Sequence, residues 1–246
     1  MSRPTSPDIA DHHWAWFLDV DGTLLEIESR PDLVTADTRL LFLLDSLSKA
    51  YDGAVALISG RSLDQLDEIF GSFKIAAAAS HGLERRMPDG TVTMQARKIP
   101  ARSVDRIMAF AERHQGLMVE RKPFSIGIHY RNRPELEDAV IDAMEKIHAE
   151  LDNGFRLMRG KMVVEILPEG ADKGSAIRAF MSAFPFKGRL PVFVGDDVTD
   201  EHGFAVINQL GGMSIRVGNC AGSAAKWRLE NVADLRTWLQ SALDLL

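Results

Sequence analysis

Two groups of acidic residues lie far apart in the chain, each directly after an apolar run. The run Trp14–Val20 contains Asp19 near its end, and Asp21 follows in a turn. The segment Gly195–Glu201 places four acids within six residues after a second apolar run. A helix N-cap with acids in its first turn would explain one or two of them. Four gathered carboxylates repel each other without a cation, and hard oxygen ligands favour Mg²⁺.

Two further polar residues are suited to binding a phosphate group. Ser59 begins the turn Ser59–Arg61 after an apolar run, where a hydroxyl and backbone N–H groups can bind a phosphate oxygen. A helix N-cap is an equally good interpretation of Ser59. Lys173 falls at the predicted start of a helix, where the macrodipole favours anions. It therefore needs an anionic neighbour, unless its side chain is solvated at the surface.

Taken together, these residue types are suited to phosphoryl transfer. One carboxylate can attack phosphorus and form an aspartyl-phosphate. A second acid can protonate the leaving oxygen and later activate water. Mg²⁺ and a lysine can offset the negative charge of the phosphoryl oxygens.

The hydrophobic periodicity predicts the elements that would bring these residues together. Strands alternate with amphipathic helices at both ends of the chain, which is typical of an α/β fold with a Rossmann-like parallel sheet. In such sheets the carboxyl ends of the strands share one edge, where ligands bind. The predicted strands are 14–20, 54–58, 74–79, 192–194 and 213–217, and the predicted helices are 37–51, 62–70 and 172–184.

The alternation changes in the middle of the chain. Helices are predicted at 102–114 and 134–151, and the strands 124–131 and 161–167 lack crossover helices. This pattern predicts a smaller α+β domain inserted into the core. We expect the core to comprise residues 1–99 and 169–246 and the insert to comprise residues 100–168.

Composition limits the partners. The 246 residues include 29 Lys plus Arg and 35 Asp plus Glu, a formal net charge of −6. This charge argues against nucleic-acid binding through diffuse positive charge and against a polybasic membrane-binding surface. No apolar run is long enough for a membrane span, residues 1–13 do not resemble a signal peptide, and the single cysteine, Cys220, cannot form an intrachain disulfide. We expect a cytoplasmic protein, and the sequence indicates no particular oligomeric state.

Four motifs in this order resemble those of the haloacid-dehalogenase-type phosphatases: Asp19–Leu24, Ser59–Arg61, Asp172–Gly174 and Gly195–Glu201. The full form of the last motif, together with the insert, resembles the trehalose-phosphate phosphatase family. The resemblance implies that Asp19 is the nucleophile and Asp21 the general acid and base. The residues that it implies for the phosphoryl group and the adjoining substrate are Ser59, Lys173, Gly60 and Arg61.

The same resemblance implies a Mg²⁺ site. The ligands would be the side chains of Asp19 and Asp196 and the backbone carbonyl of Asp21. Asp197 and Asp200 are expected to orient metal-bound waters or the lysine, rather than to bind the metal directly.

In that family the insert is a cap domain that closes over the core. Two segments, 120–131 and 160–166, resemble its sugar-contacting strands. From spacing alone, Glu120–Lys122 and Lys161–Glu165 are better interpreted as solvent-exposed ion pairs, which contribute little. The resemblance favours sugar binding instead, because a disaccharide needs both donors and acceptors. The implied residues are Glu120, Lys122, His129, Arg131, Lys161 and Glu165.

The resemblance therefore implies Mg²⁺-dependent hydrolysis of trehalose 6-phosphate through an aspartyl-phosphate, as a step of trehalose biosynthesis. A phosphatase for another sugar phosphate, such as sucrose phosphate or a phosphoglycerate glycoside, is the nearest alternative. The core motifs would be the same, and only residues of the insert would distinguish these substrates. A catalytically silent binding module is a third interpretation, although Asp19, Asp21, Lys173 and Asp196 are all present.

Overall fold

The computed structural model describes residues 13–27, 34–71, 73–94, 97–170, 172–219 and 222–244. The N-terminal segment 1–12 and Cys220 lie outside the described residues. The chain divides into two compact units: a large unit of residues 1–94 and 172–246, and an inserted unit of residues 95–171. None of the described helices is both long and apolar enough to cross a membrane. The expected cytoplasmic location stays a prediction.

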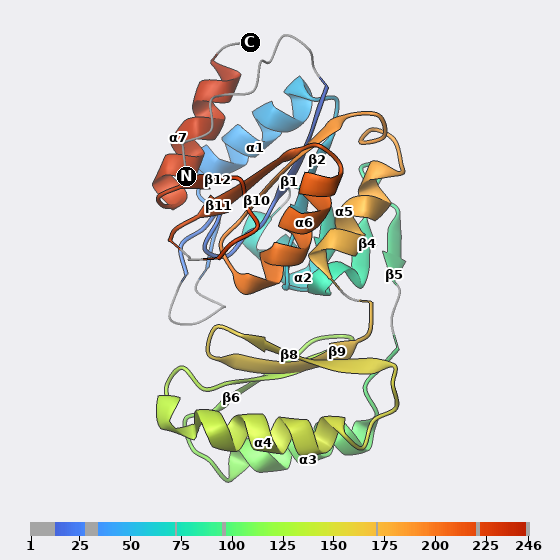
Figure 1. Cartoon of the computed structure of the whole chain (residues 1–246), viewed down its shortest axis with the longest axis vertical. Helices are drawn as coiled ribbons and strands as arrows, with labels where there is room; N and C mark the ends of the chain where they lie inside the picture. Colours follow the sequence, from blue (N-terminus) through green and yellow to red (C-terminus); the bar gives the residue numbers. More distant parts are fainter. Residues whose placement is uncertain are drawn as a thin grey trace. The chain divides into compact units, whose positions relative to one another are not determined.

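Among the described residues, the large unit forms an eight-stranded sheet in the order β12-β11-β10-β1-β2-β3-β4-β5 (Figure 1). The parallel strands are β1 (Trp14–Leu18), β2 (Val55–Ile58), β3 (Ala76–Ala79), β10 (Leu190–Gly195), β11 (Met213–Val217) and β12 (Trp227–Leu229). The antiparallel edge is formed by β4 (Glu84–Arg86) and β5 (Val92–Met94). The predicted α/β class with a mostly parallel sheet is confirmed.

Helices cover both faces of this sheet, so its central strands are buried on both sides and read as continuous apolar runs. One apolar cluster joins Trp16 and Leu18 of β1 to α1 (Thr38–Ala50), α2 (Leu63–Phe70) and α7 (Val232–Leu243). A second cluster joins the alternate β1 residues to α5 (Lys173–Met181) and α6 (Glu201–Gln209). The sheet is therefore the middle layer of three, and polar side chains at its strand ends lie at an edge of the core.

In the described part of the inserted unit, four antiparallel strands follow the order β6-β7-β9-β8. The strands are β6 (Met118–Arg121), β7 (Ile126–His129), β8 (Phe155–Gly160) and β9 (Val163–Pro168), and the helices are α3 (Ala101–Glu112) and α4 (Glu137–His148). Alternate strand residues pack on the helices, and Ile126 and Ile128 belong to that apolar cluster. The other face of the sheet is left for polar side chains.

Several predicted bounds need correction. The predicted strand 161–167 begins only at Val163, because Met162 has φ +63° and lies with Lys161 in the turn after β8. The predicted helix 134–151 opens with the 3₁₀ turn η4 (Pro134–Leu136), and its α-helical part ends at His148. Strands β8 and β12 were not predicted. Each has an arginine between apolar residues, so neither forms the continuous apolar run by which a buried strand is predicted.

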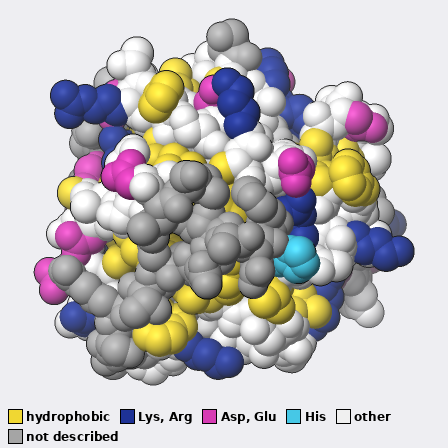
Figure 2. Space-filling model, turned by 90° about the horizontal axis from the view of Figure 1, so that it is seen from above, with side chains coloured by type: hydrophobic (Ala, Val, Ile, Leu, Met, Phe, Trp, Pro, Cys, Tyr) yellow, Lys and Arg dark blue, Asp and Glu magenta, His cyan; other side chains and the backbone are white. Residues whose placement is uncertain are grey.

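Charges are mixed on the surface. Figure 2 shows one face on which Lys, Arg, Asp and Glu side chains are scattered among hydrophobic ones. Among the described residues drawn there, neither sign gathers into a broad patch.

Candidate active site

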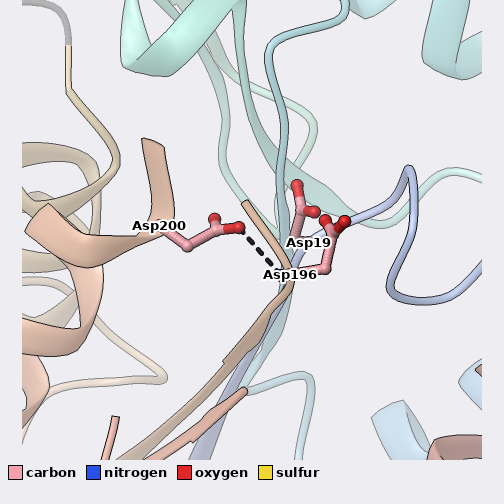
Figure 3. Close-up of side chains that lie close together, drawn as sticks. All are labelled: Asp19, Asp196 and Asp200. Carbon is pink, nitrogen blue, oxygen red and sulfur yellow. Dashed lines mark hydrogen bonds between the residues drawn. The ribbon is translucent and has the colours of Figure 1, made fainter. Parts of the chain in front are cut away.

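Sheet register brings the two acidic motifs together. Strands β1 and β10 are parallel neighbours, with Leu18 opposite Val194, and the Asp19 N–H donates to the Val194 carbonyl at 3.0 Å. The residues that follow both strands therefore leave the sheet at the same edge. One ligand oxygen from each of Asp19, Asp196 and Asp200 lies within 4.8 Å of the other two. Figure 3 shows these three side chains close together.

Lys173 lies between two of these carboxylates. Its Nζ atom is 2.6 Å from Asp19 Oδ1 and 2.6 Å from Asp200 Oδ1, and all three side chains are buried. Burial alone would lower the pKa of Lys173, but the attraction of Asp19 and Asp200 outweighs it and holds that pKa well above its ordinary value. Lys173 thus has the anionic neighbours that its position at a helix start requires.

The Asp19 carboxyl lies in an unfavourable electrostatic environment for an anion. Burial raises the pKa of Asp19 well above its usual range, repulsion from Asp200 adds to this, and Lys173 acts in the opposite direction. The Thr23 hydroxyl donates a hydrogen bond to Asp19 Oδ2 at 3.1 Å. The sequence interpretation assigned no role to Thr23, although it belongs to the first motif.

Asp200 organises the loop rather than facing outward. Its Oδ2 atom accepts the backbone N–H of Asp196 at 3.0 Å (Figure 3) and the backbone N–H of Asp197 at 2.9 Å. The Asp197 side chain completes a capping box on the 3₁₀ turn η5 (Val198–Asp200). With its other oxygen on Lys173, Asp200 has both oxygens engaged. Asp19 is likewise hydrogen-bonded at both oxygens, by Lys173 and Thr23. Asp19, Asp196 and Asp200 together form the acidic group that could hold a cation.

The donor set suits a hard divalent cation. Carboxylate oxygens are the ligands that Mg²⁺ prefers, and a divalent ion would offset the repulsion that raises the pKa of Asp19. Gly22 makes room for this arrangement: it has φ +78°, and a Cβ atom there would lie 2.2 Å from Asp196 Oδ2. The acids present thus fit a magnesium ion.

Changing Gly22 to alanine tests whether this close approach matters. We expect Gly22→Ala to displace the Asp196 carboxylate and to lower turnover by about 100-fold, as small misplacements of reacting groups do. Gly90→Ala is the matched control, because Gly90 has φ +84° and a Cβ atom there would meet nothing within 4 Å. Both variants carry the strain of a left-handed alanine, about 1–2 kcal/mol. Comparable turnover, or comparable stabilisation by Mg²⁺ in thermal melts, would contradict the prediction.

The second motif is held by a neighbouring loop. Ser62, with Gln65, caps α2, so Ser59 is not the helix cap. Ser59 Oγ accepts the Arg61 N–H at 3.1 Å, and the Ser59 carbonyl accepts the His81 N–H at 3.0 Å. A Cβ atom on Gly60 would lie 2.7 Å from His81 Cε1, so the imidazole covers this turn closely.

Arg61 turns toward the first motif. Its Nε atom is 2.7 Å from Asp21 Oδ2 and its Nη2 atom is 2.6 Å from Asp21 Oδ1. The structure therefore shows Arg61 paired with Asp21, a contact that the assignment of Arg61 to substrate did not anticipate.

Arg216 is a further residue that the sequence interpretation missed. From β11 its guanidinium donates to the backbone carbonyls of Asp196 and Asp197 and, at 2.9 Å, to Glu201. It thereby ties the acidic loop to the neighbouring strand. A single arginine within the apolar run 213–217 was the signal that could have identified it.

In the inserted unit, four of the predicted substrate residues lie together on the sheet face opposite the helices. Lys122 Nζ is 3.2 Å from Glu165 Oε1 and 3.5 Å from Glu120 Oε2, and His129 Nε2 is 3.0 Å from the same Glu120 oxygen. Ser125, which was not predicted, donates to Glu165. We call Glu120, Lys122, Ser125, His129 and Glu165 the polar cluster.

Sheet register places a glycine between the acids of this cluster. Glu120 lies opposite Gly127, and Gly127 lies opposite Glu165, so the residue between the two carboxylates has no side chain. Burial would lower the pKa of Lys122, but Glu165 and Glu120 outweigh it and raise that pKa. Lys161 and Arg131 are exposed, the former in the β8–β9 turn and the latter after β7.

The fold that brings these acids to one edge of the sheet is shared by solved structures of phosphatases. A solved structure from Bacteroides thetaiotaomicron, described among the phosphatases of the haloalkanoate enzyme superfamily, shares the fold with a TM-score of 0.60 at 16% identity, over 100% of each chain. The C-terminal domain of Candida albicans trehalose-6-phosphate phosphatase fits better, with a TM-score of 0.84 at 21% identity, over 99% of this chain and 98% of that one.

Sequence comparison gives the family. The trehalose-phosphatase family model matches residues 17–233. The trehalose-6-phosphate phosphatase of Escherichia coli (strain K12) is 43% identical over 229 residues, which is 92% of this chain and 85% of the relative. The chain belongs to the trehalose-phosphatase family and is a phosphoric monoester hydrolase. The resemblance stated from the four motifs is confirmed.

Proposed function

We propose that this protein hydrolyses trehalose 6-phosphate to trehalose and phosphate, with Mg²⁺ as cofactor and Asp19 as nucleophile. The observation that supports this most strongly is the buried Asp19–Lys173–Asp200 arrangement beside Asp196, in a chain of the trehalose-phosphatase family. A buried lysine that is paired with a carboxylate at the edge of the sheet restricts the position of that carboxylate and orients it for attack.

The proposed reaction has two displacements at phosphorus. Asp19 attacks, the bond from phosphorus to the sugar oxygen breaks, and that oxygen keeps the electron pair and takes a proton from Asp21. Asp21 then removes a proton from water as the water oxygen attacks phosphorus, which releases phosphate and restores the Asp19 carboxylate. Lys173 and Ser59 would hold the phosphoryl oxygens. Mg²⁺, held by Asp19, Asp196 and the Asp21 carbonyl, would supply positive charge for those oxygens.

We infer that the inserted unit serves as a cap whose polar cluster binds the sugar. The cluster combines donors and acceptors, which suits hydroxyl groups, and Gly127 places no side chain between the strand positions of the two carboxylates. Closing such a cap would exclude water from the phosphoryl site. This assignment makes the cluster the part of the protein that selects among sugar phosphates.

A panel of sugar phosphates, assayed with and without Mg²⁺, tests the proposal. We expect the highest kcat/KM on trehalose 6-phosphate, complete loss of turnover with EDTA, and recovery when Mg²⁺ is restored. A clear preference for sucrose phosphate or a phosphoglycerate glycoside would assign another substrate. An unchanged rate in EDTA would refute the metal's role.

Lys122→Met separates sugar binding from phosphoryl transfer. We expect it to raise KM for trehalose 6-phosphate by about 10- to 100-fold, the effect of losing a hydrogen bond from a charged group. Turnover of p-nitrophenyl phosphate, which carries no sugar, should change less than about threefold. Lys146→Met is the control in the same unit, since Lys146 is exposed on α4 and pairs along its own helix with Asp142. An equal loss of activity on trehalose 6-phosphate and on p-nitrophenyl phosphate would contradict a role of Lys122 in sugar binding.

A further inference from the structure

The contact between Arg61 and Asp21 joins two motifs that lie 40 residues apart in the sequence. The guanidinium meets both carboxylate oxygens, at 2.7 and 2.6 Å, in a two-point arrangement. The Arg61 side chain is 10% exposed, whereas the Asp21 side chain is 37% exposed. The contact therefore holds a largely buried cation against a carboxylate that still reaches solvent.

The backbone of Arg61 is itself held by two hydrogen bonds. Its N–H donates to Ser59 Oγ at 3.1 Å, and its carbonyl accepts the Ser80 N–H at 2.6 Å. Because a guanidinium is planar, two parallel N–H donors fix both the position and the plane of the carboxylate they bind. Asp21, in the turn after β1, thereby gains an orientation that its own turn does not impose.

We propose that Arg61 is a positioning residue that acts through Asp21, instead of a ligand of the phosphoryl group. This inference rests on the proposed function, in which Asp21 gives its proton to the sugar oxygen as the bond to phosphorus breaks. Proton donation depends on the direction of the carboxyl group. Without Arg61 this two-point contact is lost, and Asp21 would protonate the leaving sugar oxygen less effectively.

The dependence of the rate on the leaving group distinguishes a positioning role of Arg61 from binding of the phosphoryl group. A sugar alkoxide is strongly basic and needs the proton, whereas p-nitrophenolate is a stable anion and leaves without one. The value of kcat/KM reports steps only up to departure of the leaving group, so later hydrolysis of the aspartyl-phosphate does not obscure it. A phosphoryl ligand would matter equally for both esters, because both carry the same phosphoryl group.

The experiment compares kcat/KM of Arg61→Ala with that of the unaltered chain on trehalose 6-phosphate and on p-nitrophenyl phosphate. We expect a fall of about 100-fold on the sugar ester and less than about threefold on the aryl ester, in line with general-acid effects. Arg86→Ala is the control: Arg86 is also 10% exposed and pairs with Asp67, and it should leave both values within about threefold. If Arg61→Ala does not fold, Arg61→Lys keeps the charge without the two-point contact, and the same split is expected.

A double variant completes the test. If Arg61 acts through Asp21, adding Arg61→Ala to Asp21→Asn should lower the sugar-ester value no more than about twofold further. Equal falls on both esters, or a further large fall in the double variant, would overturn the inference. The proposed function is judged separately by the unaltered chain. If it prefers another alkyl phosphate, the comparison is run on that ester.

Discussion

Replacing Asp19 with asparagine is expected to abolish phosphate release while leaving the protein folded. Asparagine has nearly the same shape: its amide oxygen can accept from Lys173, and its NH2 group can donate to the Thr23 hydroxyl. It cannot attack phosphorus, and removal of a nucleophile lowers turnover by at least about four orders of magnitude. Phosphate release and circular dichroism, measured on the same sample, would check both halves of the prediction.

The matched control for this variant is Asp67→Asn. Asp67 also accepts from a buried cation, with Arg86 at 2.7 Å, but it lies on α2 outside the acidic group described for the site. Loss of this pair is expected to lower stability and leave turnover intact. Substantial phosphate release by Asp19→Asn would mean that another group is the nucleophile.

Lys173→Met is expected to destabilise the protein as well as inactivate it. The change leaves the buried carboxylates of Asp19 and Asp200 without their shared cation. Removing one partner of a buried ion pair costs about 3–5 kcal/mol of unfolding free energy. Urea denaturation would measure this loss, and phosphate release would fall to background because the phosphoryl oxygens lose their lysine.

The pH dependence of this loss has a definite sign. The pKa of Asp19 is already raised by burial and by Asp200, and removing Lys173 takes away the opposing effect. The folded state of Lys173→Met then binds protons at a higher pH than the unfolded state does, so its stability rises as the pH falls through that range. A deficit that stays constant from neutral to acidic pH would contradict this.

A second variant separates stability from catalysis at this position. Adding Asp200→Asn to Lys173→Met removes one of the two uncompensated charges, so part of the lost unfolding free energy should return. Activity should stay at background, since neither change replaces the lysine. Recovery of turnover along with stability would show that Lys173 has only a structural role.

The sequence by itself determined the class of fold, the positions of the main strands along the chain, and the family. Runs such as 54–58 and 192–194 are buried on both faces of a sheet, and that burial demands continuous apolar residues that can be read locally. The acids could be assigned to one edge because parallel strands share the direction in which they end. These inferences need only periodicity and chain direction.

Only the tertiary structure decided which polar groups meet. Lys173 reaches Asp19 across 154 residues, Arg61 turns to Asp21, and Asp196 packs against Gly22. Lys122 pairs with Glu165 because β7 lies between β6 and β9, an order that strand patterns do not specify. Such contacts depend on sheet order, register and side-chain rotamers, and a shift of a single residue in register would turn each strand side chain to the other face.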